Sequence, residues 1–206
     1  MKKRLAIIGA SELGNQIAHY APISVNKYEV VGFFDDFANG DLILGKVADI
    51  AAVYERDVFD CLIVGVGYKS MSFRSTIFNR YCGKIPFATI IHPSCYVDET
   101  AIIAEGCVLY PHVTIDKNVR LNGNALVNLG CVIAHDSVVG QDTFIAPSVT
   151  VAGFCVIGEQ NFIGVGAVVK DGVEIIGNVV IGAGTIIISN VVESGTYVGV
   201  PAKRIK

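Results

Sequence analysis

Charged residues are scarce in this chain, and long apolar runs are missing from it. Lys, Arg, Asp and Glu make up 17% of the 206 residues, whereas apolar residues make up 52%. This composition excludes a disordered chain and provides for a sizeable core. The net charge of −3 gives no reason to expect a nucleic acid or an anionic membrane surface as a partner. No apolar run approaches the ~20 residues that a membrane-spanning helix needs, so we expect no membrane span.

Paired cysteines and a targeting segment are also missing. The six cysteines form no CxxC pair and no metal-ligand spacing, which favours a reduced, cytoplasmic compartment. The start, "MKKRLAIIGA", has an apolar stretch of only Leu5 to Ile8. A signal peptide needs ~7–15 such residues, so we interpret this stretch as a first strand with a basic lead-in.

Histidine is rare as well, with four residues in the chain. A catalytic zinc site needs three protein ligands that converge. His112 and His135 are 23 positions apart, and His92 precedes the repeat described next. We therefore expect no metal.

A repeat of period six fills the second half of the chain. An aliphatic residue recurs at every sixth position, and Glu193 ends the series. The sixteen members are Val97, Ile103, Leu109, Ile115, Leu121, Val127, Ile133, Val139, Ile145, Val151, Ile157, Ile163, Val169, Ile175, Ile181 and Ile187. A helix would show a period of 3.6 and a two-faced strand a period of 2. Period six indicates short strands joined by tight corners, and three such units close one coil. Stacked at roughly 4.8 Å, such coils form a parallel β-helix over residues 97 to about 198.

A mostly small residue follows four places after each aliphatic. We expect it to point inward at a crowded corner. Cys107, Cys131 and Cys155 occupy this position, so we expect them to be core fillers and neither a disulfide nor a metal set.

The first 85 or so residues alternate strands with helices. "RLAIIG", "YEVVGFFDD" and "DCLIVGVG" are typical of strands, and "ASELGNQIAHYA" and "SMSFRSTIFNRY" of helices. This order predicts a parallel sheet with right-handed crossovers. We place the domain boundary near residues 85–95, with domains at 1–90 and 91–206.

Polar and glycine residues gather where these strands end, at the edge where open α/β sheets bind ligands. "GASELG" opens the first helix, where backbone N–H groups can meet a phosphate. Its middle residue, Ser11, replaces a glycine of the dinucleotide pattern, which weakens the case for NAD. The domain is also about half the size of a two-unit dinucleotide fold, so a mononucleotide or nucleotide sugar fits better. Asp35 or Asp36 could accept from a ribose hydroxyl or a pyrimidine N3–H, and Arg74 could reach a phosphate. An ordinary turn without a ligand is the alternative for "GASELG" and for the Asp pair. The whole candidate set is Gly9, Ser11, Asp35, Asp36, Gly65, Gly67, Lys69 and Arg74.

His135 and Asp136 stand in "CVIAHDSVVG", two and three places past Ile133. That register puts His135 at a corner and facing outward. A histidine can take a proton from an amine or hydroxyl at neutral pH, and a carboxylate beside it can fix its tautomer. A plain surface pair is the alternative, and the pairing requires the corner to bend the chain.

The order of "IIGASELG", "GFFDD", "IIHPSCYVDETAIIAEGCVL", "VNLGCVIAHDSVVGQDTFIAPSVTVAG" and "GTYVGVPAKRIK" resembles the NeuD/PglD-type sugar acetyltransferases over essentially the whole chain. The resemblance implies an α/β, Rossmann-like nucleotide-sugar domain followed by a left-handed parallel β-helix. It also implies a cytoplasmic homotrimer that binds acetyl-CoA between subunits and serves lipopolysaccharide or other surface-glycan biosynthesis.

The same resemblance implies roles for single residues. His135 matches the catalytic base and Asp136 its acidic partner, while the Gly153 N–H matches a donor near the thioester carbonyl. Phe144 stands where the family often has histidine. The remaining matches to the acetyl-CoA site are Asn128, Gly164, Gly166, Ala183, Pro201 and Lys203.

We therefore expect an acetyl-CoA-dependent N-acetyltransferase acting on a nucleotide-linked amino sugar, of the 4-amino-4,6-dideoxyhexose class, without an acyl-enzyme. An O-acetyltransferase acting on sialic acid or a related sugar is the alternative. Tight binding of a nucleoside diphosphate would favour the amino-sugar interpretation. A non-catalytic structural β-helix is a third possibility, but the irregular outward positions and the appended α/β domain argue against it. An NAD-dependent oxidoreductase rests only on the altered glycine pattern.

Overall fold

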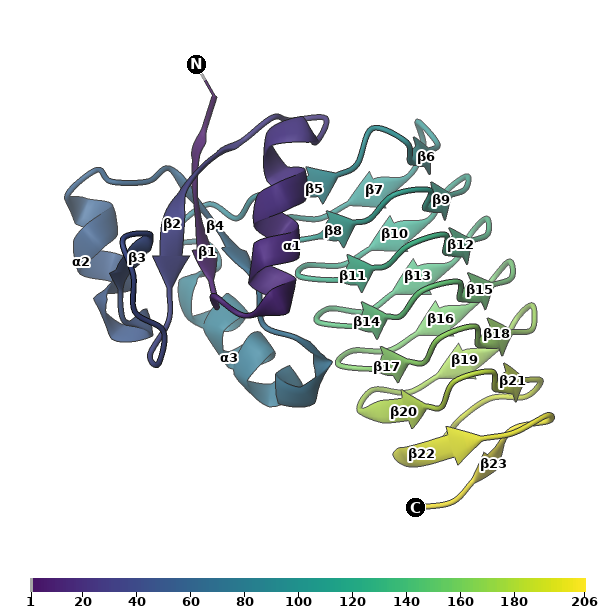
Figure 1. The fold of residues 1–206 in the computed structure, drawn as a ribbon. Helices are drawn as coiled ribbons and strands as arrows, with labels where there is room; N and C mark the ends of the chain where they lie inside the picture. Colours follow the sequence, from purple (N-terminus) through teal and green to yellow (C-terminus); the bar gives the residue numbers. More distant parts are fainter. Residues whose placement is uncertain (1) are drawn as a thin grey trace. The chain divides into compact units, whose positions relative to one another are not determined.

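The computed structural model describes residues 2–206 (Figure 1). The chain divides into two compact units, Met1–Pro93 and Ser94–Lys206, each of which is described by itself. No helix within residues 2–206 has both the length and the apolar character that crossing a membrane requires.

The first unit contains a parallel sheet with strand order β3-β2-β1-β4. Its strands are β1 (Arg4–Ile8), β2 (Glu29–Phe34), β3 (Ile43–Gly45) and β4 (Cys61–Val64), and β5 (Ile90–Ile91) ends the unit. Its helices are α1 (Glu12–Tyr20), α2 (Ile50–Glu55) and α3 (Met71–Tyr81). The predicted strands and helices are confirmed. The sequence did not reveal β3 and α2, because three and six residues are too few to show a period.

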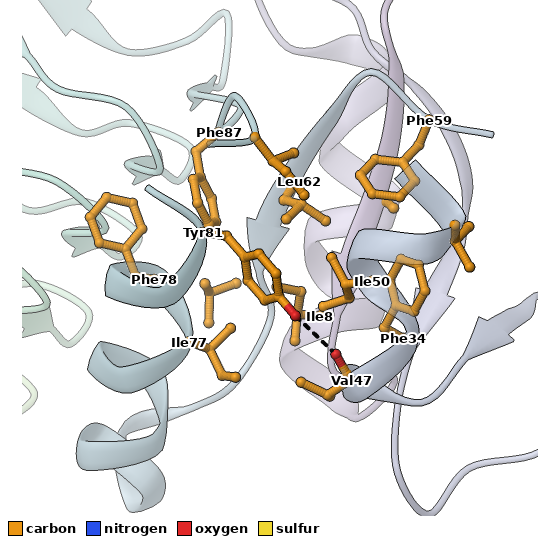
Figure 2. Packing of buried hydrophobic residues seen from close by; sticks show 14 residues of the cluster. Ile8, Phe34, Val47, Ile50, Phe59, Leu62, Ile77, Phe78, Tyr81 and Phe87 are labelled. Atoms are coloured by element: carbon orange, nitrogen blue, oxygen red, sulfur yellow. Dashed lines mark hydrogen bonds between the residues drawn. The ribbon is translucent and has the colours of Figure 1, made fainter. Parts of the chain in front are cut away.

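The core of this unit lies between the sheet and helices α2 and α3 (Figure 2). Ile8, Phe34 and Leu62 come from the strands, and Ile50 and Phe78 from the two helices. The Tyr81 hydroxyl, at the end of α3, donates to the Val47 carbonyl at 3.2 Å and so stays paired inside the core. The other face of the sheet meets α1, since Gly14 lies against Ile7.

The turn between β1 and α1 depends on its glycines. Gly9 has a φ of +102°, a conformation that side chains disfavour. A Cβ on Gly14 would strike the Gly9 carbonyl, so only glycine lets the helix pack this closely.

The second unit is a β-helix built of short strands (Figure 1), most of which have two residues. One face comprises β6 (Tyr96–Val97), β9 (Thr114–Ile115), β12 (Val132–Ile133), β15 (Thr150–Val151), β18 (Val168–Val169) and β21 (Ile186–Ile187). A second comprises β7 (Ile102–Ile103), β10 (Arg120–Leu121), β13 (Val138–Val139), β16 (Val156–Ile157) and β19 (Glu174–Ile175). The third comprises β8 (Val108–Leu109), β11 (Leu126–Val127), β14 (Phe144–Ile145), β17 (Phe162–Ile163), β20 (Val179–Ile181), β22 (Gly195–Val198) and β23 (Lys203–Arg204).

The predicted coil of three repeat units is confirmed by the parallel register. Ile133 pairs with Ile115 on one side and with Val151 on the other, which are the third aliphatics before and after it in the series. Fourteen of the sixteen aliphatics, from Leu109 onward, are at most 2% exposed. Each such burial contributes ~1.5–3 kcal/mol, so the stack does not need its outward residues for stability.

From Gly106 to Gly184, every sixth residue lies at a corner and adopts the left-handed conformation. The φ values lie between +54° and +79° from Gly106 to Gly184. The fourteen residues are Gly106, His112, Asn118, Asn124, Gly130, Asp136, Asp142, Ser148, Phe154, Gln160, Gly166, Gly172, Asn178 and Gly184. Glycine, Asn and Asp tolerate this conformation, whereas a bulky phenylalanine is an outlier.

The inward small position also carries a hydrogen-bond pattern. The thiols of Cys107, Cys131 and Cys155 donate to the carbonyls fifteen residues later, at 3.2, 3.0 and 3.2 Å. The Ser137 hydroxyl does the same at 3.0 Å. The three cysteines are buried and form no disulfide, as expected of core fillers, and burial raises the pKa of the Cys131 thiol to about 11.

Candidate active site

His135 and Asp136 occupy one corner of the β-helix, between β12 and β13. The Asp136 φ of +58° turns the chain back, so that Oδ2 lies 3.0 Å from His135 Nδ1. The imidazole is 46% exposed and the carboxylate 35% exposed. The corner therefore bends as the pairing requires, and the pair faces outward.

Asp136 has a second partner one coil earlier. Asn118 Nδ2 donates to Asp136 Oδ1 at 2.9 Å. This hydrogen bond, followed by the one to His135, lowers the pKa of the Asp136 carboxyl below its usual range. An ionised carboxylate can only accept, so His135 Nδ1 carries the ring proton. Nε2 is then the nitrogen that is free to take a proton.

Gly153 and Phe154 lie one coil later and flank the imidazole. A Cβ on Gly153 would stand 2.7 Å from His135 Cε1 and 2.8 Å from Nε2. The Phe154 ring meets the imidazole edge-on, with centroids 5.0 Å apart and an angle of 88°. Phe154 is 61% exposed and sits in a left-handed corner with φ +57°. Strain of this kind collects at functional sites.

The backbone N–H of Gly153 is available. Among residues 2–206, no group accepts a hydrogen bond from it. The structure therefore brings His135, Asp136 and the Gly153 N–H together at one corner.

The other residues expected at the acetyl-CoA site lie elsewhere on this unit. Asn128, Gly164, Gly166 and Ala183 lie at a different corner, between the third face and the first. Phe144, on β14, is only 5% exposed, and its ring centroid is 6.0 Å from that of Phe162.

Two further expected residues lie near the C-terminus. Pro201 follows the cis Val200–Pro201 bond, and Lys203 is an exposed residue of β23, which pairs antiparallel with β22.

A pocket of about 490 Å³ opens at the carboxyl ends of the strands in the first unit. The predicted residues Gly9, Ser11, Asp35 and Asp36 line it together. Its apolar surface comes from Ile8, Phe34, Val47, Val66, Phe37 and Phe73.

A neighbouring depression of about 430 Å³ is lined by Ser11, Gly67 and Lys69, among others. Gly65 lines neither hollow, because it is packed against the Gly14 backbone, where a Cβ would come within 2.8 Å of Gly14 Cα.

The two aspartates of the pocket have different roles. Asp35 Oδ2 accepts from the Ala10 N–H at 2.8 Å, and its Oδ1 accepts from the N–H groups of Phe37 and Ala38. These bonds, that of Ala10 first, lower the pKa of the Asp35 carboxyl. Asp35 thus holds the two loops together. Asp36 is exposed, and its Oδ1 accepts from the Val47 N–H at 3.0 Å.

The expectation that Arg74 reaches a phosphate needs correction. Its side chain is fully buried and donates to the Val66 carbonyl at 3.0 Å and the Val64 carbonyl at 3.4 Å. These carbonyls at the carboxyl end of β4 hold the guanidinium inside the unit. Arg74 fixes the loop after β4 and does not face the pocket.

Four residues of these sites escaped the sequence analysis. Asn118 and Phe154 could have been found by stepping one coil, which is three repeat units, back and forward from Asp136. Phe37 and Phe73 gave a weaker signal, as aromatic residues at the ends of predicted elements. Among residues 2–206, no group of three or more His, Cys, Asp or Glu side chains is arranged to hold a metal ion.

Comparison with known proteins agrees with this architecture. The bacterial transferase hexapeptide (six repeats) family matches residues 136–171. None of the curated proteins matches this sequence.

Several solved structures share the fold over the whole chain. The acetyltransferase domain of PglB from Neisseria gonorrhoeae FA1090 is 26% identical, with a TM-score of 0.90, and the match covers 99% of this chain and 100% of that one. PerB from Caulobacter crescentus, solved in complex with CoA and GDP-perosamine, is 24% identical, with a TM-score of 0.91 and coverage of 98% and 97%. WeeI from Acinetobacter baumannii AYE is 19% identical, with a TM-score of 0.81 and coverage of 98% and 99%. The hexapeptide repeat at residues 136–171 and the full-length likeness to the PglB acetyltransferase domain therefore indicate an acyltransferase that is similar to the sugar acetyltransferases.

Proposed function

We propose that the protein is an N-acetyltransferase that transfers the acetyl group of acetyl-CoA to the amine of a nucleotide-linked amino sugar. The acceptor belongs to the 4-amino-4,6-dideoxyhexose class. The observation that carries this proposal is the half-exposed His135 imidazole, whose Nδ1 lies 3.0 Å from Asp136 Oδ2. Acetyl-CoA bound to the PglB domain and GDP-perosamine bound to PerB support the two substrate classes.

His135 acts as the general base of the reaction. The sugar amine forms a bond to the thioester carbonyl carbon, the carbon–sulfur bond breaks, and CoA leaves as its thiol. Nε2 accepts the proton that the amine loses, and Asp136 stabilises the imidazolium that results. The imidazolium then gives this proton to the departing sulfur, which restores the neutral base. The open Gly153 N–H donates to the oxyanion formed on the way. No acyl-enzyme is required, because the amine is itself the nucleophile.

The first unit holds the nucleotide in a Rossmann-like domain. The apolar surface of its pocket fits a base, and the exposed Phe37 and Phe73 offer rings against which a base can stack. Asp36 has a carboxylate oxygen available for a ribose hydroxyl or a base N–H. Ser11 at the start of α1, with Gly67 and Lys69 beside it, fits the diphosphate.

Three copies form the working enzyme, each with a left-handed β-helix. His135 and Asn128 lie at different corners, so a neighbouring copy must supply the second corner if both contact acetyl-CoA. In this arrangement Asn128, Phe144, Gly164, Gly166, Ala183, Pro201 and Lys203 line the channel opposite the neighbour's His135.

The activity is tested with purified protein, acetyl-CoA, and GDP-, UDP- and dTDP-linked 4-amino-4,6-dideoxyhexoses. We expect CoA thiol release and a product that is heavier by one acetyl group, with the amine acetylated. The matched control is the nucleotide sugar that has a hydroxyl in place of the amine. Acetylation of that hydroxyl, or of free sialic acid, with no reaction at any amine would refute N-acetylation and support the O-acetyltransferase.

A further inference from the structure

A ladder of side chains runs along the corner that bears His135. Thr100, Asn118 and Asp136 occupy the same place in three successive coils, so each lies one coil after the last. Asn118 and Asp136 share the left-handed conformation, with φ values of +57° and +58°. Their side chains therefore leave the corner in the same way and can meet.

The ladder leaves Asp136 with both carboxylate oxygens engaged. Oδ1 accepts from Asn118 Nδ2 at 2.9 Å, while Oδ2 meets His135 Nδ1 at 3.0 Å. An exposed carboxylate with one partner is free to rotate about its terminal torsion, which is broad. Two donors on opposite oxygens fix that torsion, and Asn118 is the donor that is not part of the histidine pair.

Asn118 is itself held from the preceding coil. Its backbone N–H donates to Thr100 Oγ1 at 2.7 Å, and the Thr100 hydroxyl donates to Asp98 Oδ1 at 2.6 Å. Because one hydroxyl both accepts and donates, the chain of contacts runs unbroken from Asp98 to the imidazole. Asn118 is therefore placed before any substrate arrives.

We propose that Asn118 is a positioning residue for the acetyl transfer, which keeps the Asp136 carboxylate turned toward His135 Nδ1 and thereby keeps Nε2 unprotonated and aimed outward. This role rests on the proposed function of His135 as the base. Asn118 touches neither substrate and acts only through Asp136. Which ring nitrogen of a histidine carries the proton is set by the partner of the other nitrogen, so loss of the fixed carboxylate releases the tautomer.

The variant Asn118→Gly removes the amide but retains a residue that adopts the left-handed conformation without strain. Asn118→Asp keeps the size and shape but has no N–H to donate to an ionised Asp136. The control is Asn178→Gly, which makes the same change at another left-handed corner residue, with φ +61°, away from His135.

The readout is the tautomer of His135, measured by NMR on protein labelled with 15N-histidine and without substrate. The His135 signals are assigned by their loss in His135→Gln. We expect mainly the Nδ1–H form in the wild type and in Asn178→Gly, and a smaller Nδ1–H fraction in both Asn118 variants. In the acetyl-transfer assay the Asn118 variants should lose about 10-fold in kcat, with unchanged KM, since comparable supporting contacts cost about 10- to 100-fold.

An Nδ1–H fraction in Asn118→Gly equal to that of the wild type would overturn the proposal. An equal change in Asn178→Gly would overturn it too, because the effect would then be a general loosening of the coils. The NMR result does not depend on the acetyl-transfer reaction. A His135→Ala variant that keeps full turnover would refute the proposed function and leave the positioning result standing.

Discussion

Gly153→Ala tests whether the His135 imidazole needs a residue without a side chain beneath it. The added Cβ would stand 2.7 Å from His135 Cε1, 2.8 Å from Nε2 and 3.2 Å from Nδ1. Non-bonded carbon atoms rest at about 3.5–4.0 Å, so the ring must move by roughly 0.7 Å or more. It cannot move freely, because Asp136 holds Nδ1 and the Phe154 ring lies edge-on beside it.

We expect that shift of the ring to lower kcat and to leave the free energy of unfolding nearly unchanged. A misplacement of about 1 Å can cost ~100-fold in rate, so we expect kcat to fall about 10- to 100-fold. The φ of Gly153 lies outside the left-handed region, so alanine fits the backbone. Its lower unfolded-state entropy contributes about 0.4–1 kcal/mol in favour of folding, which offsets part of any packing cost. Alanine also keeps the N–H, so the loss reports displacement of His135.

The assay compares initial rates and thermal melting of the wild type, Gly153→Ala and Asp171→Ala. Asp171 occupies the same corner position one coil later and is exposed, so its variant should keep the wild-type rate. Wild-type kcat in Gly153→Ala would refute the view that this glycine positions the base.

Three further predictions concern other parts of the chain. Phe154→Asn relieves the strain of a bulky residue in the left-handed conformation, which is worth about 1 kcal/mol. Calorimetry should therefore show a higher Tm, while kcat falls. An unchanged Tm would show that Phe154 is not strained. Asp35 has a lowered pKa and so contributes stability that is complete above its unfolded value of about 3.9 and is lost as the pH falls through the folded value. Asp35→Asn should therefore lower the urea midpoint more at pH 7 than at about pH 3, and an equal loss at both would contradict this sign. Cys131→Ser keeps a donor to the Ala146 carbonyl and should unfold near the wild-type midpoint. Cys131→Ala loses this donor and should lose about 1 kcal/mol or more of the free energy of unfolding. A serine variant as unstable as the alanine variant would argue against the hydrogen bond.

The β-helix could be predicted in detail because one short pattern determines it. A buried aliphatic such as Ile133 at every sixth position fixes the strand, the corner and the coil together. The outward placement of His135 follows from the same register. The contact with Asp136 did not follow, because it depends on the φ of one corner residue.

The contacts of the first unit were harder to predict. Arg74 lies in a helix whose sequence shows no clear apolar face. Its burial depends on the carbonyls of Val64 and Val66, at the end of β4 and just after it. Asp35 stands at the expected edge, but its oxygens are taken by backbone N–H groups whose direction depends on the path of the loop. Such contacts join segments with no repeat between them, so no spacing in the sequence reports them.

The most direct test of the central claim is the rate at which the His135→Ala variant acetylates the amine of the nucleotide sugar. His135 is 46% exposed and outside the core, so the variant should fold and melt like the wild type. If His135 is the base, its kcat falls by ~10²–10⁴, the contribution typical of general-base catalysis. A folded His135→Ala enzyme that retains near-full turnover would contradict the account.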